Sequence, residues 1–224
     1  LGWEKTTQYN YGIDFSFLNG RIGGSMDVYH SNTNDLLLSM TIPTLTGFNS
    51  TYANVGKTKN FGVDLSLNLV PIQTKDFEWN STINAAYQKD EIVELANGKQ
   101  DDISNAWFIG EAISVYYGTA CDGLWQESDA EEMAKFNANG HKFEAGMVKP
   151  VDQDGNYVID GDDRIILGNK NPKWVLGWSN TFSYKGFELG IELNGRFGYM
   201  VDTGGEGQYG MYNQRKIDYW TPDN

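Results

Sequence analysis

Long runs of two-residue alternation between apolar and polar residues constrain the fold of this chain more than any other feature. Residues 9–17, 61–69 and 187–193 each place large apolar side chains at every second position, with polar residues or glycine between them. Successive side chains of a β-strand point to opposite faces, so each run predicts a strand with one apolar and one polar face. Runs of about ten such residues are typical of transmembrane β-strands, which are apolar toward lipid and polar toward a lumen.

The connections between the expected strands alternate in length. Strands are expected over residues 4–18, 21–35, 57–70, 77–88, 174–184 and 187–197. The connections at Asn19-Gly20, at 71–76 and at 185–186 are short, whereas those at 39–55, at 88–172 and from 198 onward are long. Outer-membrane barrels combine tight periplasmic turns with long extracellular loops in this way. The predicted fold class is therefore all-β, an antiparallel transmembrane β-barrel segment with long extracellular loops.

Composition agrees with this class and argues against others. The formal net charge of −13 disfavours a nucleic-acid partner, because an acidic surface repels phosphates. The mean hydropathy of −0.50 is low for a helical membrane protein but suits a barrel, in which half of each strand faces water. No run approaches 18 consecutive apolar residues, so a transmembrane helix is not expected. No nucleophile, phosphate-loop or paired-cysteine motif occurs, so we expect no enzyme.

Six strands are too few for a closed barrel, since about eight are needed to enclose even a filled interior. Closure matters in lipid because open edges leave backbone groups unpaired. We therefore expect residues 1–224 to be a partial barrel domain, with the remaining strands elsewhere in a longer polypeptide.

The longest connection, residues 88–172, is predicted to be an extracellular loop insertion. One short helix is expected from Asp129 to about Asn137, with Ser128 as its N-cap and Glu131 completing a capping box. Aromatic side chains in the loops could stack on sugar rings; an alternative is that they pack the loops or anchor the rim. These candidates for substrate binding are Trp107, Tyr116, Tyr117 and Trp125, together with Tyr209.

The sharpest chemical motif is the acidic loop, residues 152–163. Oxygen donors fall at the spacing of a twelve-residue Ca²⁺ loop of the EF-hand type. The six predicted ligands are Asp152, Asp154, Asn156, the Val158 carbonyl, Asp160 and Asp163. Two residues depart from the pattern: Tyr157 replaces the usual glycine at position six, and Asp163 replaces the usual glutamate at position twelve. The alternative is a solvated acidic turn that holds no metal.

A set of short segments, in order through nearly the whole chain, points to one family: residues 3–15, 27–29, 33–37, 54–56, 60–64, 117–118, 122–126, 152–164, 168–169 and 185–187, with Pro172. In these segments the chain resembles the SusC/RagA-type TonB-dependent outer-membrane transporters of Bacteroidetes. Tyr157 stands where relatives usually have glycine.

This resemblance implies a large plugged barrel in the outer membrane of a Gram-negative cell. It implies an upstream plug domain and TonB box, a SusD-like surface lipoprotein as partner, and TonB-energised import of oligosaccharides or peptides. No catalytic residues carry over, because the family is not enzymatic.

A second hypothesis is a soluble, secreted β-sandwich that binds glycans through loop aromatics and Ca²⁺. The two hypotheses differ in what the apolar strand faces contact. In a barrel these faces meet lipid, and the residues expected there include Phe61, Leu65, Leu67, Phe77, Trp79 and Trp178.

Overall fold

The computed structural model describes residues 2–41, 45, 47–48, 50–202 and 220–221. The chain divides into two compact units, which we call the sheet unit (Leu1–Val115 and Asn169–Met200) and the loop unit (Tyr116–Gly168 and Val201–Asn224). Tyr209 and most of the connection expected from residue 198 onward lie outside the described residues. Among the described residues, no helix has both the length and the apolar composition needed to cross a bilayer.

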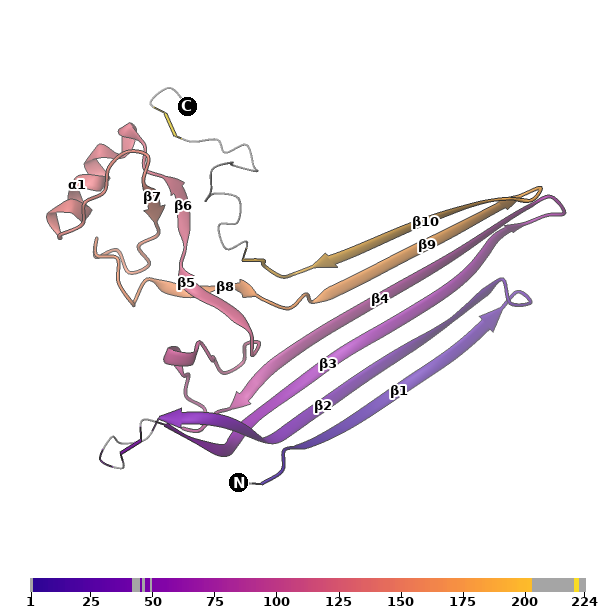
Figure 1. Ribbon diagram of the computed structural model, residues 1–224, viewed down its shortest axis with the longest axis horizontal. Helices are drawn as coiled ribbons and strands as arrows, with labels where there is room; N and C mark the ends of the chain where they lie inside the picture. Colours follow the sequence, from indigo (N-terminus) through magenta and orange to yellow (C-terminus); the bar gives the residue numbers. More distant parts are fainter. Residues whose placement is uncertain (1, 42–44, 46, 49, 203–219, 222–224) are drawn as a thin grey trace. The chain divides into compact units, whose positions relative to one another are not determined.

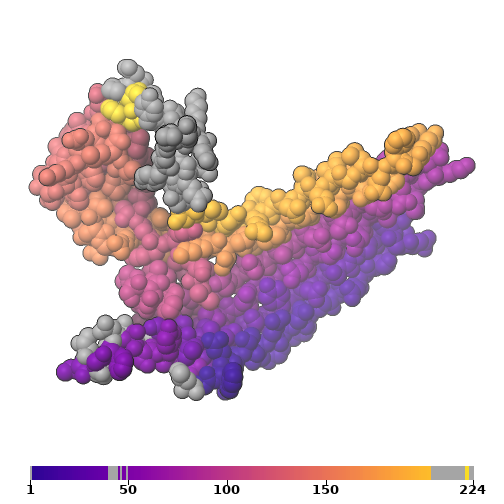
Figure 2. Space-filling model, viewed as in Figure 1, coloured from indigo at the N-terminus to yellow at the C-terminus, as the bar shows by residue number. Residues whose placement is uncertain are grey.

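The sheet unit is built on one antiparallel sheet with strand order β1-β2-β3-β4-β9-β10. Its strands are β1 (Lys5–Phe17), β2 (Ile22–Thr41), β3 (Ser50–Gln73), β4 (Phe77–Glu94), β9 (Trp174–Tyr184) and β10 (Phe187–Phe197). The hairpins β1–β2, β3–β4 and β9–β10 turn at the same end of the sheet (Figure 1). The six strands follow one another as a continuous surface from indigo to orange (Figure 2). The predicted antiparallel segment is confirmed, with β1 and β10 at its two edges.

Strand register places the apolar positions of all six strands on one face. Leu65, for example, is opposite Met26 on β2 and Ala85 on β4. The predicted lipid-facing residues share this face; Leu67 pairs with Ile83, which in turn pairs with Trp178. We call it the lipid face. The opposite face carries the polar and glycine positions, such as Asp64 and Asn84.

Aromatic side chains border the lipid face at both ends of the strands. Tyr87 packs on Trp174 with ring centroids 4.7 Å apart, and Trp79 stacks on Phe182 at 5.5 Å. Tyr87 and Phe77 bound the apolar stretch of β4, ten residues apart and so roughly 34 Å along the strand. With the usual strand tilt this is about 25 Å along the membrane normal, the height of the apolar band of a barrel.

Three strands extend beyond the ranges that sequence alternation predicted for them. β2 and β3 pair as far as Thr41 and Ser50, so the expected 39–55 loop shortens to residues 42–49. A bulge near Asp35, which has a positive φ of 59°, shifts the register, and three consecutive leucines then break the alternation. β4 likewise runs to Glu94 rather than ending near residue 88. Four of its last six residues are charged, and the buried Ile92 exchanges backbone hydrogen bonds with Gly110 and Glu111 of the insertion, so this end of β4 shows no simple alternation.

The tight turns also differ in detail from prediction. Asn19-Gly20 is part of a four-residue turn, because Phe17 and Ile22 form the last strand pair. Lys185-Gly186 is the predicted two-residue turn: both residues have positive φ, 45° and 86°, which matches the right-handed strand twist.

The insertion contains regular structure that sequence alternation did not reveal. Residues 95–173 carry two 3₁₀ turns, four short strands and the predicted helix. These are η2 (Ile103–Asn105), β5 (Val115–Thr119), β6 (Cys121–Leu124), η3 (Glu127–Asp129), α1 (Ala130–Ala138), β7 (Val148–Pro150) and β8 (Arg164–Asn169). β5 pairs with β8, and β6 pairs with β7. The predicted Ser128 cap is wrong: Asp129 is the N-cap of α1, and the capping box links Gln126 to Asp129 around η3.

A polar cluster fixes the pairing of β4 with β9, the strands that flank the insertion. Ser81 and Asn180 face each other on the lipid face, yet each side chain is only 4% exposed. Two indoles cover this pair: Trp79 Nε1 donates to Asn180 Oδ1 at 3.0 Å, and Trp178 Nε1 donates to Ser81 Oγ at 2.9 Å. A two-residue slip in register would break both hydrogen bonds in an apolar environment, so the cluster favours one register.

Replacing Trp178 by phenylalanine should lower the free energy of unfolding of the full-length barrel by about 1 kcal/mol, a typical value for a hydrogen bond in a membrane. The ring is largely kept, so the change reports mainly the lost N–H donor. Urea titrations of receptor refolded in lipid vesicles would measure it. The matched control is Trp174→Phe, since the described part of the chain gives the Trp174 indole no hydrogen-bond partner. Equal destabilisation by both variants would contradict a role for the hydrogen bond.

Candidate functional site

The loop unit has a small aromatic core of its own. Trp125, Met133 and Phe136 are buried, with exposed fractions of 0%, 8% and 2%. Phe143, Tyr157 and Ile159 pack against them. The two core residues of α1 lie three positions apart and so on one face of the helix. Because Tyr157 and Ile159 belong to the acidic loop, that loop is attached directly to the core.

The acidic loop brings three of its six predicted ligands together. Carboxylate oxygens of Asp152, Asp154 and Asp163 all lie within 4.8 Å of one another. Asp163 is only 1% exposed, and its two oxygens accept the Gln153 and Asp160 backbone N–H groups at 2.8 Å each. Three carboxylates in this space repel one another unless a proton or a cation neutralises them. Such a donor set fits a hard cation that prefers oxygen ligands.

The other three predicted ligands are not part of this carboxylate group. Asn156 Oδ1 accepts the Val158 N–H at 2.6 Å, and Asp160 Oδ1 accepts the Asp162 N–H at 2.8 Å. These bonds wind the backbone into successive turns. The third predicted ligand is the Val158 carbonyl, which belongs to the peptide group between Val158 and Ile159.

Tyr157 occupies the position where an EF-hand loop needs a sharp turn. Its φ is +61°, the left-handed conformation that glycine adopts most readily. Its N–H donates to Asp152 Oδ2 at 2.8 Å, and its ring packs edge-on against Phe136 with centroids 5.4 Å apart. The departure from glycine therefore does not prevent the turn, because the tyrosine ring gains core contacts that offset the unfavourable backbone conformation.

Two aspartates of the cluster have pKa values shifted in opposite directions. Burial raises the pKa of Asp152, but hydrogen bonds from the Tyr157 and Gly155 backbone N–H groups outweigh it and hold the pKa below its usual value. The pKa of Asp154 is raised, first by burial and then by the neighbouring Asp152 and Asp163 carboxyls. Of these two carboxyls, Asp154 is the one whose surroundings favour the charged form less.

His141 is a residue near this loop that sequence reasoning missed. Its Nε2 accepts the Ile159 N–H at 3.0 Å across 18 positions of sequence. No spacing rule connects a histidine after a helix with a loop that far along the chain. The other histidine, His30, contacts Asn32 on the adjacent part of β2, with Nε2 3.0 Å from the amide nitrogen.

The predicted aromatic substrate ligands occupy different environments. Trp125 is wholly buried in the core, so it offers no face to a sugar ring, and its role here is packing. Lys149 covers it, with Nζ 4.5 Å from the ring centroid. Tyr116 and Tyr117 lie half-buried on β5, and the Tyr116 hydroxyl accepts the Asp202 N–H at 3.1 Å.

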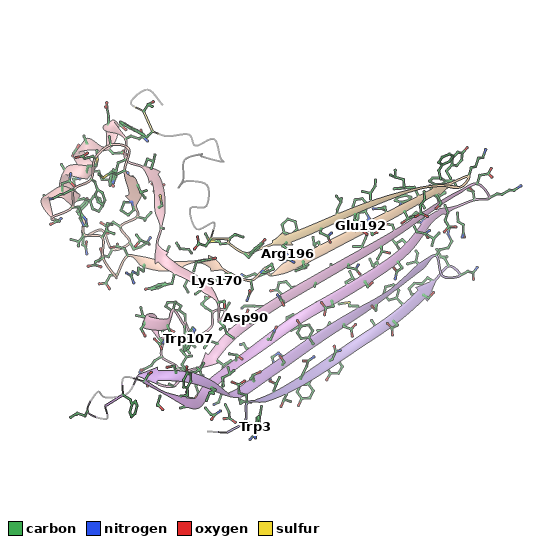
Figure 3. All side chains as sticks on the ribbon, in the orientation of Figure 1. Trp3, Asp90, Trp107, Lys170, Glu192 and Arg196 are labelled. Atoms are coloured by element: carbon green, nitrogen blue, oxygen red, sulfur yellow. The ribbon has the colours of Figure 1, made fainter. Side chains whose placement is uncertain are left out.

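Trp107 lies beside a hollow of the sheet unit. Two backbone hydrogen bonds with Asp102, of 2.8 and 2.9 Å, hold Trp107 in a tight loop. This loop lies near the end of β4 at which Asp90 is found (Figure 3). The hollow measures about 370 Å³ and combines apolar, amide and carboxyl groups. It is lined by Leu38, Ser39, Leu95, Ala96, Asn97, Gln100, Asp101, Asp102, Ile103, Ser104 and Trp107.

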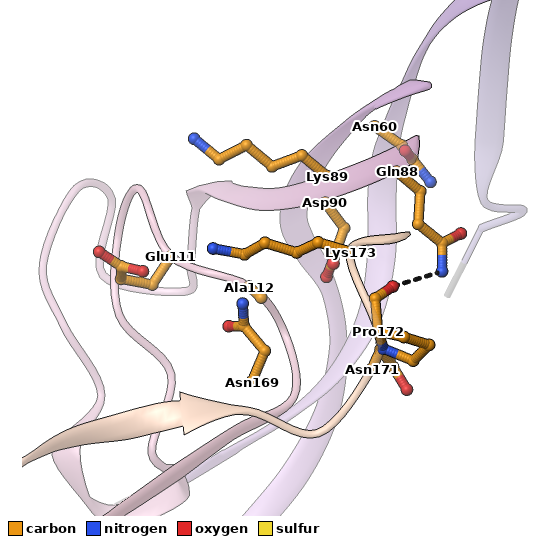
Figure 4. A pocket seen from close by; sticks show the side chains of 10 residues that line it. All are labelled: Asn60, Gln88, Lys89, Asp90, Glu111, Ala112, Asn169, Asn171, Pro172 and Lys173. Atoms are coloured by element: carbon orange, nitrogen blue, oxygen red, sulfur yellow. Dashed lines mark hydrogen bonds between the residues drawn. The ribbon is translucent and has the colours of Figure 1, made fainter. Parts of the chain in front are cut away.

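A second, smaller hollow of about 150 Å³ lies between the later part of β4 and the segment that leads into β9 (Figure 4). Gln88 closes one side of it by donating to the Pro172 carbonyl at 3.2 Å. Its lining offers ammonium, carboxyl and amide groups, which suit a hydrogen-bonding polar ligand. The lining residues are Asn60, Gln88, Lys89, Asp90, Glu111, Ala112, Asn169, Asn171, Pro172 and Lys173.

Comparison with known families identifies the class of protein to which this sheet, with its apolar and polar faces, belongs. Residues 1–224 match the family described as TonB dependent receptor-like, beta-barrel. The chain belongs to this family. TonB-dependent receptors are outer-membrane transporters, so the alternative of a soluble, secreted β-sandwich is wrong.

Curated TonB-dependent receptors match over most of the chain. The chain is 36% identical to TonB-dependent receptor SusC of Bacteroides thetaiotaomicron over 198 residues, which cover 86% of the chain and 19% of SusC. It is 30% identical to TonB-dependent receptor P26 of Formosa agariphila over 242 residues, covering all of the chain and 24% of that receptor. The chain therefore spans about a quarter or less of the length of these receptors.

Solved peptide transporters share its fold. The RagAB peptide transporter matches with a TM-score of 0.66 at 29% identity, over 87% of this chain and 21% of that one. The RagAB peptide importer in its "open-open" state matches with a TM-score of 0.70 at 27% identity, over 89% and 21%. The resemblance to SusC/RagA-type transporters is thus confirmed.

Proposed function

We propose that the parent protein is a TonB-dependent importer of oligosaccharides or peptides that works with a SusD-like surface lipoprotein. The observation that carries this proposal is the match of residues 1–224 to the receptor barrel family. The two-faced sheet supports it, because the lipid face suits a membrane wall and the polar face a lumen. TonB would act through the upstream region that the resemblance implies.

In this proposal the substrate is held by polar groups and aromatic rings at the loop end of the sheet. Trp107, beside its hollow, is the strongest of the predicted aromatic ligands. Tyr116 and Tyr117 stay candidates in the loop unit. An indole next to amide and carboxyl groups suits either a sugar ring or a peptide.

Fractionation of native cells tests the membrane assignment. The parent protein should be recovered in the outer membrane, and protease added to intact cells should cleave it within residues 88–172. A tagged receptor should also retain a surface lipoprotein on purification, and uptake of its substrate should stop when the proton-motive force is dissipated. Recovery in the soluble secreted fraction would overturn the proposal.

The acidic loop is proposed to bind Ca²⁺ as a structural cation. The clustering of Asp152, Asp154 and Asp163 supports this role, as does the left-handed turn at Tyr157. The cation would neutralise the three carboxylates and rigidify a loop that is already attached to the core. No catalytic role is implied.

Replacing Asp154 by alanine should abolish the Ca²⁺ binding that belongs to this loop. Isothermal titration of the purified receptor with Ca²⁺ would measure it as the difference in heat between wild type and variant. The matched control is Asp162→Asn, which removes a charge from the same loop at a position outside the predicted ligand set, and it should retain binding. Identical titrations of wild type and Asp154→Ala would remove the Ca²⁺ site.

A further inference from the structure

One peptide group connects His141 with the acidic loop. The amide between Val158 and Ile159 supplies the N–H that His141 Nε2 accepts at 3.0 Å. The described chain contains no cis peptide bond, so this amide is trans and its C=O points opposite to its N–H. Fixing the N–H toward His141 therefore points the Val158 carbonyl away from the imidazole. That carbonyl is the predicted ligand at position seven.

His141 itself is held firmly by the core. Its ring stacks on Phe143 with centroids 5.1 Å apart and an interplanar angle of 8°. Phe136 meets the same ring edge-on at 6.2 Å. Phe143 is fixed in turn by the Asn137 side chain at the end of α1, which accepts the Phe143 N–H at 2.7 Å and donates to its carbonyl at 3.0 Å. The helix thus sets the position of the imidazole.

The Ile159 side chain, which follows this peptide group, packs against the same core. The Val158–Ile159 amide is therefore fixed at two points, by a hydrogen bond and by an apolar contact. Accepting this hydrogen bond requires a neutral imidazole with its proton on Nδ1. A hydrogen bond at the N–H also polarises the amide and makes its carbonyl a stronger donor to a cation.

We propose that His141 is a positioning residue for the Ca²⁺ loop, which it serves by orienting and polarising the Val158 carbonyl. The inference rests on the Ca²⁺ site proposed above. Outer-shell groups of this kind commonly change metal affinity by 10- to 100-fold when removed. Here His141 acts on a backbone ligand, the Val158 carbonyl, instead of on a side-chain ligand.

Two substitutions separate the hydrogen bond from the packing of the ring. His141→Phe keeps an aromatic ring to stack on Phe143 but has no acceptor. His141→Gln loses the stacking but offers an amide oxygen to the Ile159 N–H. The experiment is calorimetric titration of the full-length receptor with Ca²⁺ alone, with Asp154→Ala as the blank and thermal unfolding in EDTA as the measure of stability without the ion.

Ca²⁺ affinity should fall roughly ten-fold or more in His141→Phe and return toward wild type in His141→Gln. In EDTA the order of stability should not follow the order of affinity, because the glutamine variant loses ring contacts that the phenylalanine variant keeps. If wild type binds Ca²⁺ and His141→Phe binds it equally well, the positioning role is wrong and the Ca²⁺ site stands. If wild type titrates like Asp154→Ala, the site fails and this inference fails with it, while the import function is unaffected.

Discussion

Replacing Phe136 by alanine should destabilise the loop unit by about 3–5 kcal/mol, the usual range for removing a buried phenylalanine ring. Phe136 is 2% exposed and contacts four other rings of the core, those of Trp125, His141, Phe143 and Tyr157. Because Phe136 is one of three buried apolar side chains that form this core among the described residues, its loss would leave a cavity at the centre of the unit. We expect the loop unit to open locally while the sheet keeps its strands.

Limited proteolysis of the intact receptor would report this opening. Cleavage within residues 116–168 should accelerate on the order of a hundred-fold or more if it requires local unfolding, given that about 1.4 kcal/mol corresponds to a factor of ten. The β-sheet signal in circular dichroism should remain. Glu131→Ala is the matched control, since Glu131 is exposed on the same helix and should leave the cleavage rate nearly unchanged. Equal cleavage of wild type and Phe136→Ala would show that the core does not hold the unit together.

Placing arginine at Leu65 should lower the free energy of unfolding of the receptor in lipid by about 2–4 kcal/mol. Leu65 is on the lipid face between Met26 and Ala85, in the middle of the apolar stretch of β3. A guanidinium there would face hydrocarbon, where charge is poorly solvated. Unfolding titrations of receptor refolded in vesicles would measure the change.

The neighbouring residue provides the control for this prediction. Ser66 points to the opposite face, opposite Ser25 and Asn84. An arginine at Ser66 would face water and lie near the Asp64 and Asp27 carboxylates, so it should be tolerated much better. A larger loss of stability for Ser66→Arg than for Leu65→Arg would show that the faces have been assigned the wrong way round.

The sequence predicted the membrane part of the fold well because lipid imposes a simple rule. Where one strand face meets lipid and the other meets water, side chains must alternate, and the alternation marks the strand. The rule no longer applies above the membrane, which is why the end of β4 after residue 88 and the end of β2 after residue 38 were predicted to be loop. The short strands of the insertion, three to six residues each, carry too few positions to show a period.

The candidate site was only partly predictable for a related reason. The acidic loop is local in sequence, so spacing alone identified Asp152, Asp154 and Asp163. The roles of Trp125 and His141 depend on contacts with residues distant in sequence within the loop unit. The local sequence does not distinguish a tryptophan that stacks on a ligand from one that fills a core. Tyr157 shows the opposite case, a residue that looked unsuitable locally and is accommodated by tertiary packing.

The pairing of β4 with β9 has a consequence for how such transporters can diversify. These strands match in register along the whole of β9, although 79 residues separate the end of β4 from its start. The entropy of closing a connection grows slowly, by about 0.6 kcal/mol for each doubling of its length. Ser81 and Asn180 fix the register of β4 with β9 within the barrel wall, and the inserted segment has a core of its own. The sequence of either part can therefore change without a change in the fold of the other. The connection between β4 and β9 is therefore a position at which a different recognition segment could be inserted without a change in the strands of the barrel.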